Sequence, residues 1–130
     1  KPIGRNQAIQ QNLALMAGDV AAARVAAMVA AADAPGSVPD TCSATPFSTA
    51  VAKVRAGEAA TRGTAIAHQV HGAIGFTHEH ALHFATRRLW AWREEFGSDA
   101  HWAAKLGHAA IEARADGFWP GLTRKQFQIP

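Results

Sequence analysis

Two long alanine-rich stretches, residues 7–32 and 46–71, constrain the fold of this chain most strongly. Alanine loses no side-chain entropy on entering a helix, so both stretches favour helices over strands. In the first stretch, apolar residues recur at spacings of three and four and so share one helical face. These residues are Ile9, Leu13, Met16 and Val20. The first stretch therefore predicts an amphipathic helix, with Asn6 as its N-cap.

The second stretch begins with a strong start signal, Thr45-Pro46, which is typical of an N-cap followed by proline at the first helical position. The residues of this helix that we expect to face inward are Val51, Val54, Ala59, Ile66 and Val70. Between the two stretches, the proline- and glycine-containing segment 33–46 predicts a long loop.

Two shorter helices are expected after a break at GAIGF, residues 72–76. We expect Thr77 to cap the third helix, with Glu79 in its first turn and Gly97 at its end. Its apolar stripe consists of Leu82, Ala85, Leu89, Trp92 and Phe96. Ser98 is the expected N-cap of the fourth helix. The stripe of that helix consists of Trp102, Leu106, Ala110 and Ala113.

Amphipathic helices joined by short or medium loops predict an all-α fold, an antiparallel up-and-down helical bundle. The 130 residues suit a single domain, of which we expect residues 116–130 to be a tail against a surface of this chain or a neighbouring one. The net charge of +3 is mild, and basic residues are interspersed with acidic ones. We therefore expect no nucleic-acid partner.

Three observations bear on the chain's surroundings. One cysteine, Cys42, cannot form an internal disulfide, so a reducing, cytoplasmic location is expected. We expect no membrane span, because no apolar run approaches the required length. The opening KPIGRNQ lacks an initiator methionine and turns at once, which indicates a piece of a longer polypeptide.

Five of the seven histidines lie within residues 68–83. His68 and His71 are three residues apart, as are His80 and His83, so each pair can share a helix face. A zinc site requires three or four converging ligands, and no HExxH motif or nearby cysteine supplies them. We therefore favour helix-terminal or interface histidines and predict no metal site. A histidine-rich metal-binding bundle remains the alternative.

The glycines between the histidines carry a different signal. Gln69, Gly72 and Gly75 place a side-chain amide before two residues that allow close backbone approach and positive φ. Successive backbone N–H groups at such a bend form an anion-binding concavity. This arrangement would suit a pyrophosphate, although the spacing is not that of the dinucleotide-binding fingerprint, since no strand precedes it.

Two segments, KPIGRNQAIQQNLALMA and AHQVHGAIGFTHEHALHFATRR, strengthen this interpretation. In wording, order and separation they resemble the C-terminal helical domain of the acyl-CoA dehydrogenase family, and the resemblance covers residues 1–115. It implies an FAD flavoprotein that oxidises the α,β carbon–carbon bond of an acyl-CoA thioester. It also implies that the first helix of the domain, like the other two domains, lies upstream of Lys1.

The resemblance assigns six residues to cofactor binding. They are Gln69, Gly72, Ala73, Gly75, Ser98 and Gln7. Ala73 stands where the family usually has glycine, and Ser98 where it often has threonine. The implied partners are the acyl-CoA substrate, the rest of the chain's own polypeptide, and further subunits in a homo-oligomer or a mixed oligomer. Residues 1–130 alone are expected neither to retain FAD nor to be active.

The catalytic residue is left unassigned. Many family members use a glutamate as base at the position taken here by Phe96, which cannot accept a proton. Glu95 is one residue away, about 100° around a helix. Two readings stay open: a base on another segment of an active enzyme, or a non-catalytic subunit of the same fold.

Overall fold

A computed structural model describes residues 2–34, 46–125, 127 and 129 of the chain. Within these residues it contains five α-helices, two short 3-10 helices and no strand. In chain order the elements are η1 (Ile3–Arg5), α1 (Gln7–Ala32), α2 (Pro46–His71), η2 (Gly72–Phe76), α3 (Leu82–Glu94), α4 (Asp99–Glu112) and α5 (Arg114–Arg124). The prediction of an all-α fold is confirmed.

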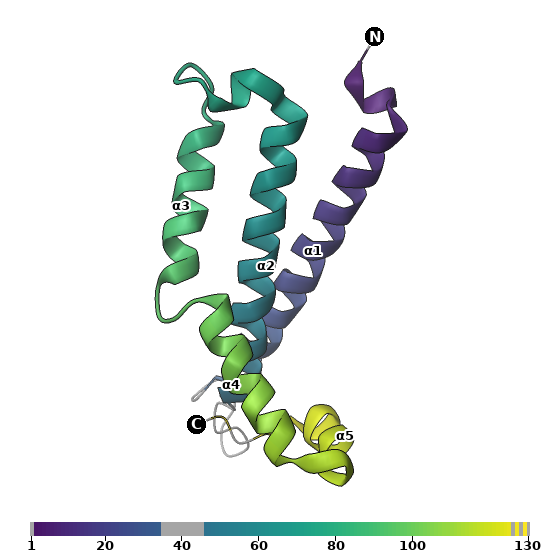
Figure 1. The fold of residues 1–130 in the computed structure, drawn as a ribbon, viewed down its shortest axis with the longest axis vertical. Coiled ribbons are helices and arrows are strands. Elements are labelled where there is room, and N and C mark those ends of the chain that lie inside the picture. Colours follow the sequence, from purple (N-terminus) through teal and green to yellow (C-terminus); the bar gives the residue numbers. More distant parts are fainter. Residues whose placement is uncertain (1, 35–45, 126, 128, 130) are drawn as a thin grey trace.

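Helices α1, α2 and α3 form an up-and-down row with α2 in the middle (Figure 1). α1 runs down one side of α2 and α3 runs down the other, both antiparallel to it. α2 also contacts α4, which continues downward from α3, while α5 lies at the end of the molecule opposite the N-terminus. α2 is therefore the element around which the fold is organised.

Local capping explains where two of the helices begin. The Oδ1 atom of Asn6 accepts a hydrogen bond from the Ala8 N–H at 3.0 Å, and α1 begins directly after it. Ser98 accepts a bond from the His101 N–H at 3.2 Å at the start of α4. Both predicted N-caps are confirmed. The predicted cap Thr45 lies outside the described residues, as does Cys42.

The contact between α1 and α2 is more polar than the apolar pattern predicted. Leu13 and Val20, expected to face inward, are exposed, and Val20 retains 54% of its accessible surface. The buried residue of α1 is Asp19, at 8% exposure. Its carboxylate lies 3.1 Å from Arg62 and 3.8 Å from Arg55, both on α2. Small alanines let the helices approach, and the buried charge is stable there because it is paired.

α3 begins later than predicted. Thr77 does not cap it, because the Thr77 hydroxyl donates to the Ile74 carbonyl at 3.0 Å. Instead the His80 ring, through Nδ1, accepts the Leu82 N–H at 3.1 Å, and the helix begins at Leu82. Glu79 consequently precedes the helix rather than lying in its first turn.

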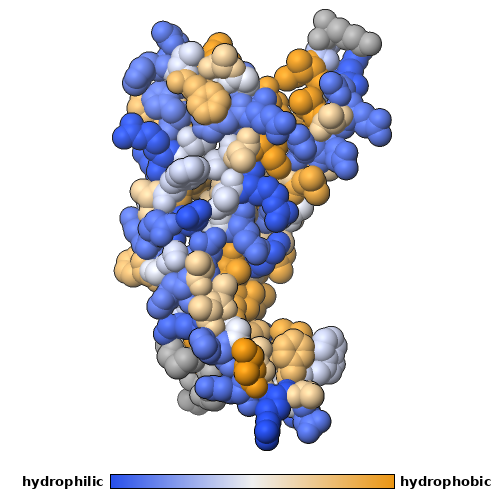
Figure 2. Space-filling view, in the orientation of Figure 1, coloured by the Kyte–Doolittle hydropathy of each residue, from blue (hydrophilic) through white to orange (hydrophobic). Residues whose placement is uncertain are grey.

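The expected apolar stripe of α3 is largely open to solvent. Leu89, Trp92 and Phe96 are exposed, whereas Thr86 is the buried residue of the helix. Figure 2 shows apolar surface gathered along α1 and again near α5. The row of helices thus buries the residues that face α2 and leaves apolar side chains of α1 and α3 exposed.

The segment expected as a tail contains a helix, so that part of the prediction was wrong. α5 spans Arg114–Arg124 and includes Pro120. Beyond it, Phe127 is buried and packs its ring 5.4 Å from that of Phe47, with Ala109 completing a small core. The tail was expected to lie against a surface of this chain or of a neighbouring one, and Phe127 lies against this chain.

α1 also corrects the expectation about apolar runs. Over its 26 residues it is long and apolar enough, by length and composition alone, to cross a membrane. Only 6% of this apolar window is buried, although the Asp19–Arg62 ion pair places α1 in a helix–helix contact. The absence of a membrane span stays a prediction.

Candidate functional site

The two glycines of the bend after α2 have different structural roles. Gly72 has φ +62°, a left-handed conformation, and a Cβ built on it would meet no atom within 4 Å. Gly75 is buried, and a Cβ there would lie 2.9 Å from the Cβ of His71 and 3.2 Å from Leu82. Gly72 therefore turns the chain and leaves its backbone open, while Gly75 lets η2 pack closely.

The other two motif residues are accessible. Gln69 and Ala73 are both exposed, on the last turns of α2 and in η2. The Gln69 Oε1 atom has a long contact, 3.5 Å, with the side-chain amide of Asn12 on α1. Because this contact is at the limit of a hydrogen bond, the Gln69 amide is available to a stronger partner.

His68 attaches the bend to α3. Its Nε2 atom lies 3.2 Å from the Thr86 hydroxyl, and its ring stacks on Phe76 with centroids 4.4 Å apart. Its Nδ1 atom is buried and, among the described residues, has no hydrogen-bond partner. The His68 ring thus connects η2, through Phe76, to α3, through Thr86.

Three further histidines bond to backbone. His71 and His83 donate through Nδ1 to carbonyl oxygens one turn earlier, Ala67 and His80, each at 2.7 Å. His80 accepts through Nδ1 from Leu82. Across the described parts of the chain, no group of three or more His, Cys, Asp or Glu side chains is placed to hold a metal ion. His71, His80 and His83 each bond to backbone groups two to four residues away.

The six candidate residues divide between two ends of the molecule. Gln7, the first residue of α1, lies at the same end as residues 69–75 (Figure 1). Ser98 lies beyond the other end of α3, whose 13 residues span about 20 Å. A single copy of the chain therefore does not bring all six together.

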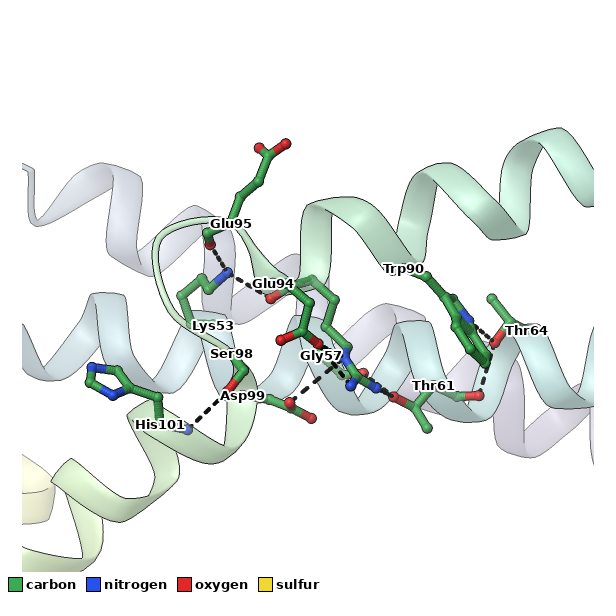
Figure 3. Close-up of polar contacts among 11 residues, drawn as sticks. Lys53, Gly57, Thr61, Thr64, Trp90, Glu94, Glu95, Ser98, Asp99 and His101 are labelled. Atoms are coloured by element: carbon green, nitrogen blue, oxygen red, sulfur yellow. Dashed lines mark hydrogen bonds and ion pairs between the residues drawn. The ribbon is translucent and has the colours of Figure 1, made fainter.

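Ser98 belongs to a tightly held turn, residues 95–98, between α3 and α4. Lys53 of α2 donates to the carbonyl oxygens of Glu95 at 2.7 Å and Arg93 at 3.3 Å (Figure 3). On its other side, the Trp102 indole N–H donates to the Phe96 carbonyl at 3.0 Å. Sequence reasoning missed Lys53 and Trp102, because a lysine in α2 gives no sign that it reaches residues 40 positions away.

Neither Phe96, at the usual position of the family's base, nor its neighbour Glu95 is buried. Phe96 retains 91% of its accessible surface. Glu95 is exposed, and Figure 3 shows its side chain pointing away from the residues drawn around it. Within the turn, Glu95 is bound through its backbone carbonyl, which accepts a hydrogen bond from Lys53.

Comparison with known proteins agrees with the sequence interpretation. The family described as acyl-CoA dehydrogenase, C-terminal domain, matches residues 1–114. Neither the curated proteins nor the solved structures contain a match to the chain. The matched segment includes the bend at residues 69–75 and the turn at 95–98, and it ends where α5 begins. The chain therefore belongs to the acyl-CoA dehydrogenase family, of which it carries the C-terminal domain.

Proposed function

We propose that this chain is the C-terminal domain of a cytoplasmic, FAD-dependent acyl-CoA dehydrogenase that oxidises the α,β carbon–carbon bond of an acyl-CoA thioester. The open bend from Gln69 to Gly75, in a chain whose residues 1–114 match the family, carries the proposal. The domain contributes contacts to the cofactor and between subunits. We propose no nucleic-acid partner and no membrane span.

The bend fits the pyrophosphate part of FAD. Gly72 presents open backbone with positive φ, and a Cβ there would meet no neighbour. Ala73 is exposed, so its methyl group lies at the surface and not in a packed space where only glycine would fit. Gln69 adds a side-chain amide, and Gln7 lies at the same end of the molecule. FAD, when bound, supplies a hydride acceptor; these residues hold and orient it.

The separation between the bend and Ser98 favours an oligomer. With about 20 Å of α3 between them, the two ends of one chain suit two different cofactor molecules. The bend would then serve a cofactor held mainly by a neighbouring subunit, while Ser98 lies near the chain's own. This arrangement requires the rest of the polypeptide and a second subunit, in a homo-oligomer or a mixed one.

A second candidate function is a non-catalytic subunit of the same fold in a mixed assembly. The exposed Phe96 ring at the usual position of the base favours it, since no carboxylate in the turn replaces the missing glutamate. The two candidates differ in one property: the dehydrogenase must have a base on another segment, whereas the subunit has none.

The test is Gln69→Ala in the full-length protein. A polar cofactor atom left without its partner weakens binding by about 1–3 kcal/mol, so the Kd for FAD should rise by roughly 5- to 150-fold and flavin should be lost more readily in dialysis. Gln11→Ala, an exposed glutamine of α1, is the matched control and should leave flavin content unchanged. Equal flavin retention in Gln69→Ala and wild type would contradict the cofactor assignment.

Anaerobic reduction of the bound flavin by an acyl-CoA separates the two candidates. The dehydrogenase should bleach its flavin absorbance within a single turnover. A non-catalytic subunit should retain an oxidised flavin, or carry none, until its catalytic partner is added.

A further inference from the structure

The histidines around the bend carry their ring hydrogens on different atoms, which their hydrogen bonds determine. A backbone carbonyl oxygen only accepts, so His71 and His83, which bond to carbonyls through Nδ1, carry a hydrogen on that atom. A backbone N–H only donates, so His80, which bonds to the Leu82 N–H, must keep a lone pair on Nδ1. The neutral His80 ring therefore carries its hydrogen on Nε2.

A second proton has different consequences for these rings. His71 and His83 can take it up at Nε2 and still donate through Nδ1 to their carbonyls. His80 can take it up only at Nδ1, because its Nε2 already carries a hydrogen, and the protonated ring has no lone pair left. Protonation of His80 therefore breaks its bond to the Leu82 N–H, which is the first donor of α3.

The surroundings of His80 also disfavour its charge. His80 lies just before α3, where the end of the helix dipole is positive, so an imidazolium there is destabilising. On α2, the His71 ring lies 4.8 Å from the His80 ring, centroid to centroid, and the two repel each other once both are charged. On α3, His83 bonds to the His80 carbonyl, and its ring lies 5.5 Å from that of His78. Glu79, the acidic neighbour of His80, is exposed, so solvent screens the charge with which it offsets this repulsion.

Leu82 connects the His80 bond to the bend at residues 69–75. A Cβ built at Gly75 would lie 3.2 Å from Leu82 and 2.9 Å from the Cβ of His71. Gly75 is therefore packed between the start of α3 and the end of α2. When the Leu82 N–H loses its partner, the residue that forms one wall of this packing is no longer fixed, and the bend is less tightly held.

We propose that His80 is a proton-sensitive cap: through its Nδ1 lone pair it fixes the start of α3 and the bend, and a proton on that atom releases both. Histidine is the side chain that ordinarily changes its charge between pH 5 and pH 8. Because the neutral ring makes the bond and the protonated ring cannot, the released junction takes up more protons than the ordered one. The ordered junction therefore becomes less stable as the pH falls through this range. The proposed function gives His80 no role, and the release requires no ligand.

The test is His80→Asn in the full-length protein. Hydrogen exchange of the backbone amides of residues 72–84 is measured by mass spectrometry at pH 8 and pH 5, with labelling times scaled to equal intrinsic exchange. Asparagine does not titrate in this range, and it can accept a backbone N–H two residues on, as Asn6 does from Ala8 at 3.0 Å. Wild-type protection should fall by about tenfold at pH 5, as expected for losing a cap and adding a charge of the wrong sign. Protection in His80→Asn should be the same at both pH values.

Two controls separate the cap from other effects of acid. Amides of residues 51–66, in the middle of α2, should keep their protection at pH 5, which distinguishes local release from unfolding of the domain. The second control is His83→Gln, since His83 can be protonated without losing its own bond. This variant should retain the fall in protection seen in wild type.

Three outcomes would overturn the proton-sensitive cap. The first is equal wild-type protection of residues 72–84 at both pH values. The second is a fall that persists in His80→Asn; if that fall disappears in His68→Gln, the buried Nδ1 atom of His68 is the sensor instead. The third is low protection at pH 8 both in His80→Asn and in His80→Asp, a second variant with an acceptor that stays ionised from pH 5 to pH 8, because an acceptor at this position would then not fix the start of α3.

Discussion

Gly57 of α2 lies directly against Asp99 of α4, so that a Cβ built at position 57 would lie 2.8 Å from the Asp99 carboxyl carbon. This contact sets how closely the start of α4 approaches α2. Asp99 also lies 3.8 Å from Arg93 at the end of α3. The glycine therefore helps to place the junction that holds Ser98 and the turn at residues 95–98.

Gly57→Ala should lower the free energy of unfolding by about 1–3 kcal/mol, because the new methyl group forces apart two packed helices. Gly63→Ala is the matched control on the same helix, where the nearest side-chain atom, Met16 Cγ, is at an ordinary 3.7 Å. It should stabilise the helix by about 0.5–1 kcal/mol. Urea denaturation measures both, and shifts of the same sign would contradict the close contact.

Gly121→Ala should detach the end of the chain. The Phe127 ring lies 2.6 Å from the position of a Cβ at residue 121, so alanine and the buried ring exclude each other. Losing the burial of one aromatic side chain should cost about 1.5–3 kcal/mol. Limited proteolysis followed by mass spectrometry should then show faster cleavage after α5. Gly107→Ala, with open space around it, should leave cleavage unchanged.

The contact between Asp33 and Lys125 should make stability depend on pH in the acid range. Hydrogen bonds from Lys125, at 2.8 and 2.9 Å, and from Ser48 hold the pKa of Asp33 below its usual value. A carboxyl group with a depressed folded-state pKa stabilises the fold above its unfolded pKa of about 3.9, and this contribution is lost as the pH falls through the folded-state pKa.

Asp33→Asn should therefore lower the urea midpoint at pH 7, and its difference from wild type should shrink as the pH falls below the unfolded pKa of about 3.9. Lys125→Met removes the same pair from the other side and should reproduce the effect. A difference between wild type and Asp33→Asn that is constant from pH 7 to pH 2.5 would show that the ion pair contributes nothing to folding.

Local sequence signals predicted the long helices, whereas tertiary contacts determined where α3 begins and that α5 forms. Asn6 and Ser98 cap helices because a polar side chain before an apolar run suffices for that role. The start of α3 was missed because Thr77 and His80 are both local cap candidates, and nothing in their spacing tells which one the packing favours. α5 was missed because Gly117, Pro120 and Gly121 are typical of turns. A contact with Phe127 overrides that preference.

The candidate site shows the same division. Gln69, Gly72 and Gly75 form a local motif, so the sequence predicted the bend and its open backbone. Lys53 reaches the turn at residues 95–98 through the packing of α2 against α3, which no spacing in the sequence encodes. Asp19 was missed for a related reason, since apolar periodicity does not register a buried carboxylate paired across helices.

Glu95 is the carboxylate nearest to the usual position of the family's base, and we predict that it is not one. Its side chain is exposed and points away from its neighbours (Figure 3), while Lys53 binds its backbone carbonyl, a group that substitution of the side chain preserves. In a full-length protein that is active, Glu95→Gln should leave turnover of an acyl-CoA within severalfold of wild type.

The control is Glu94→Gln, which changes the neighbouring residue, whose carboxylate pairs with Arg93 at 2.8 Å. Removing a general base lowers turnover by about 10²–10⁴-fold. A loss of that size in Glu95→Gln, with flavin content intact and Glu94→Gln unaffected, would mean that the turn reorganises when substrate binds and brings the carboxylate to the α carbon.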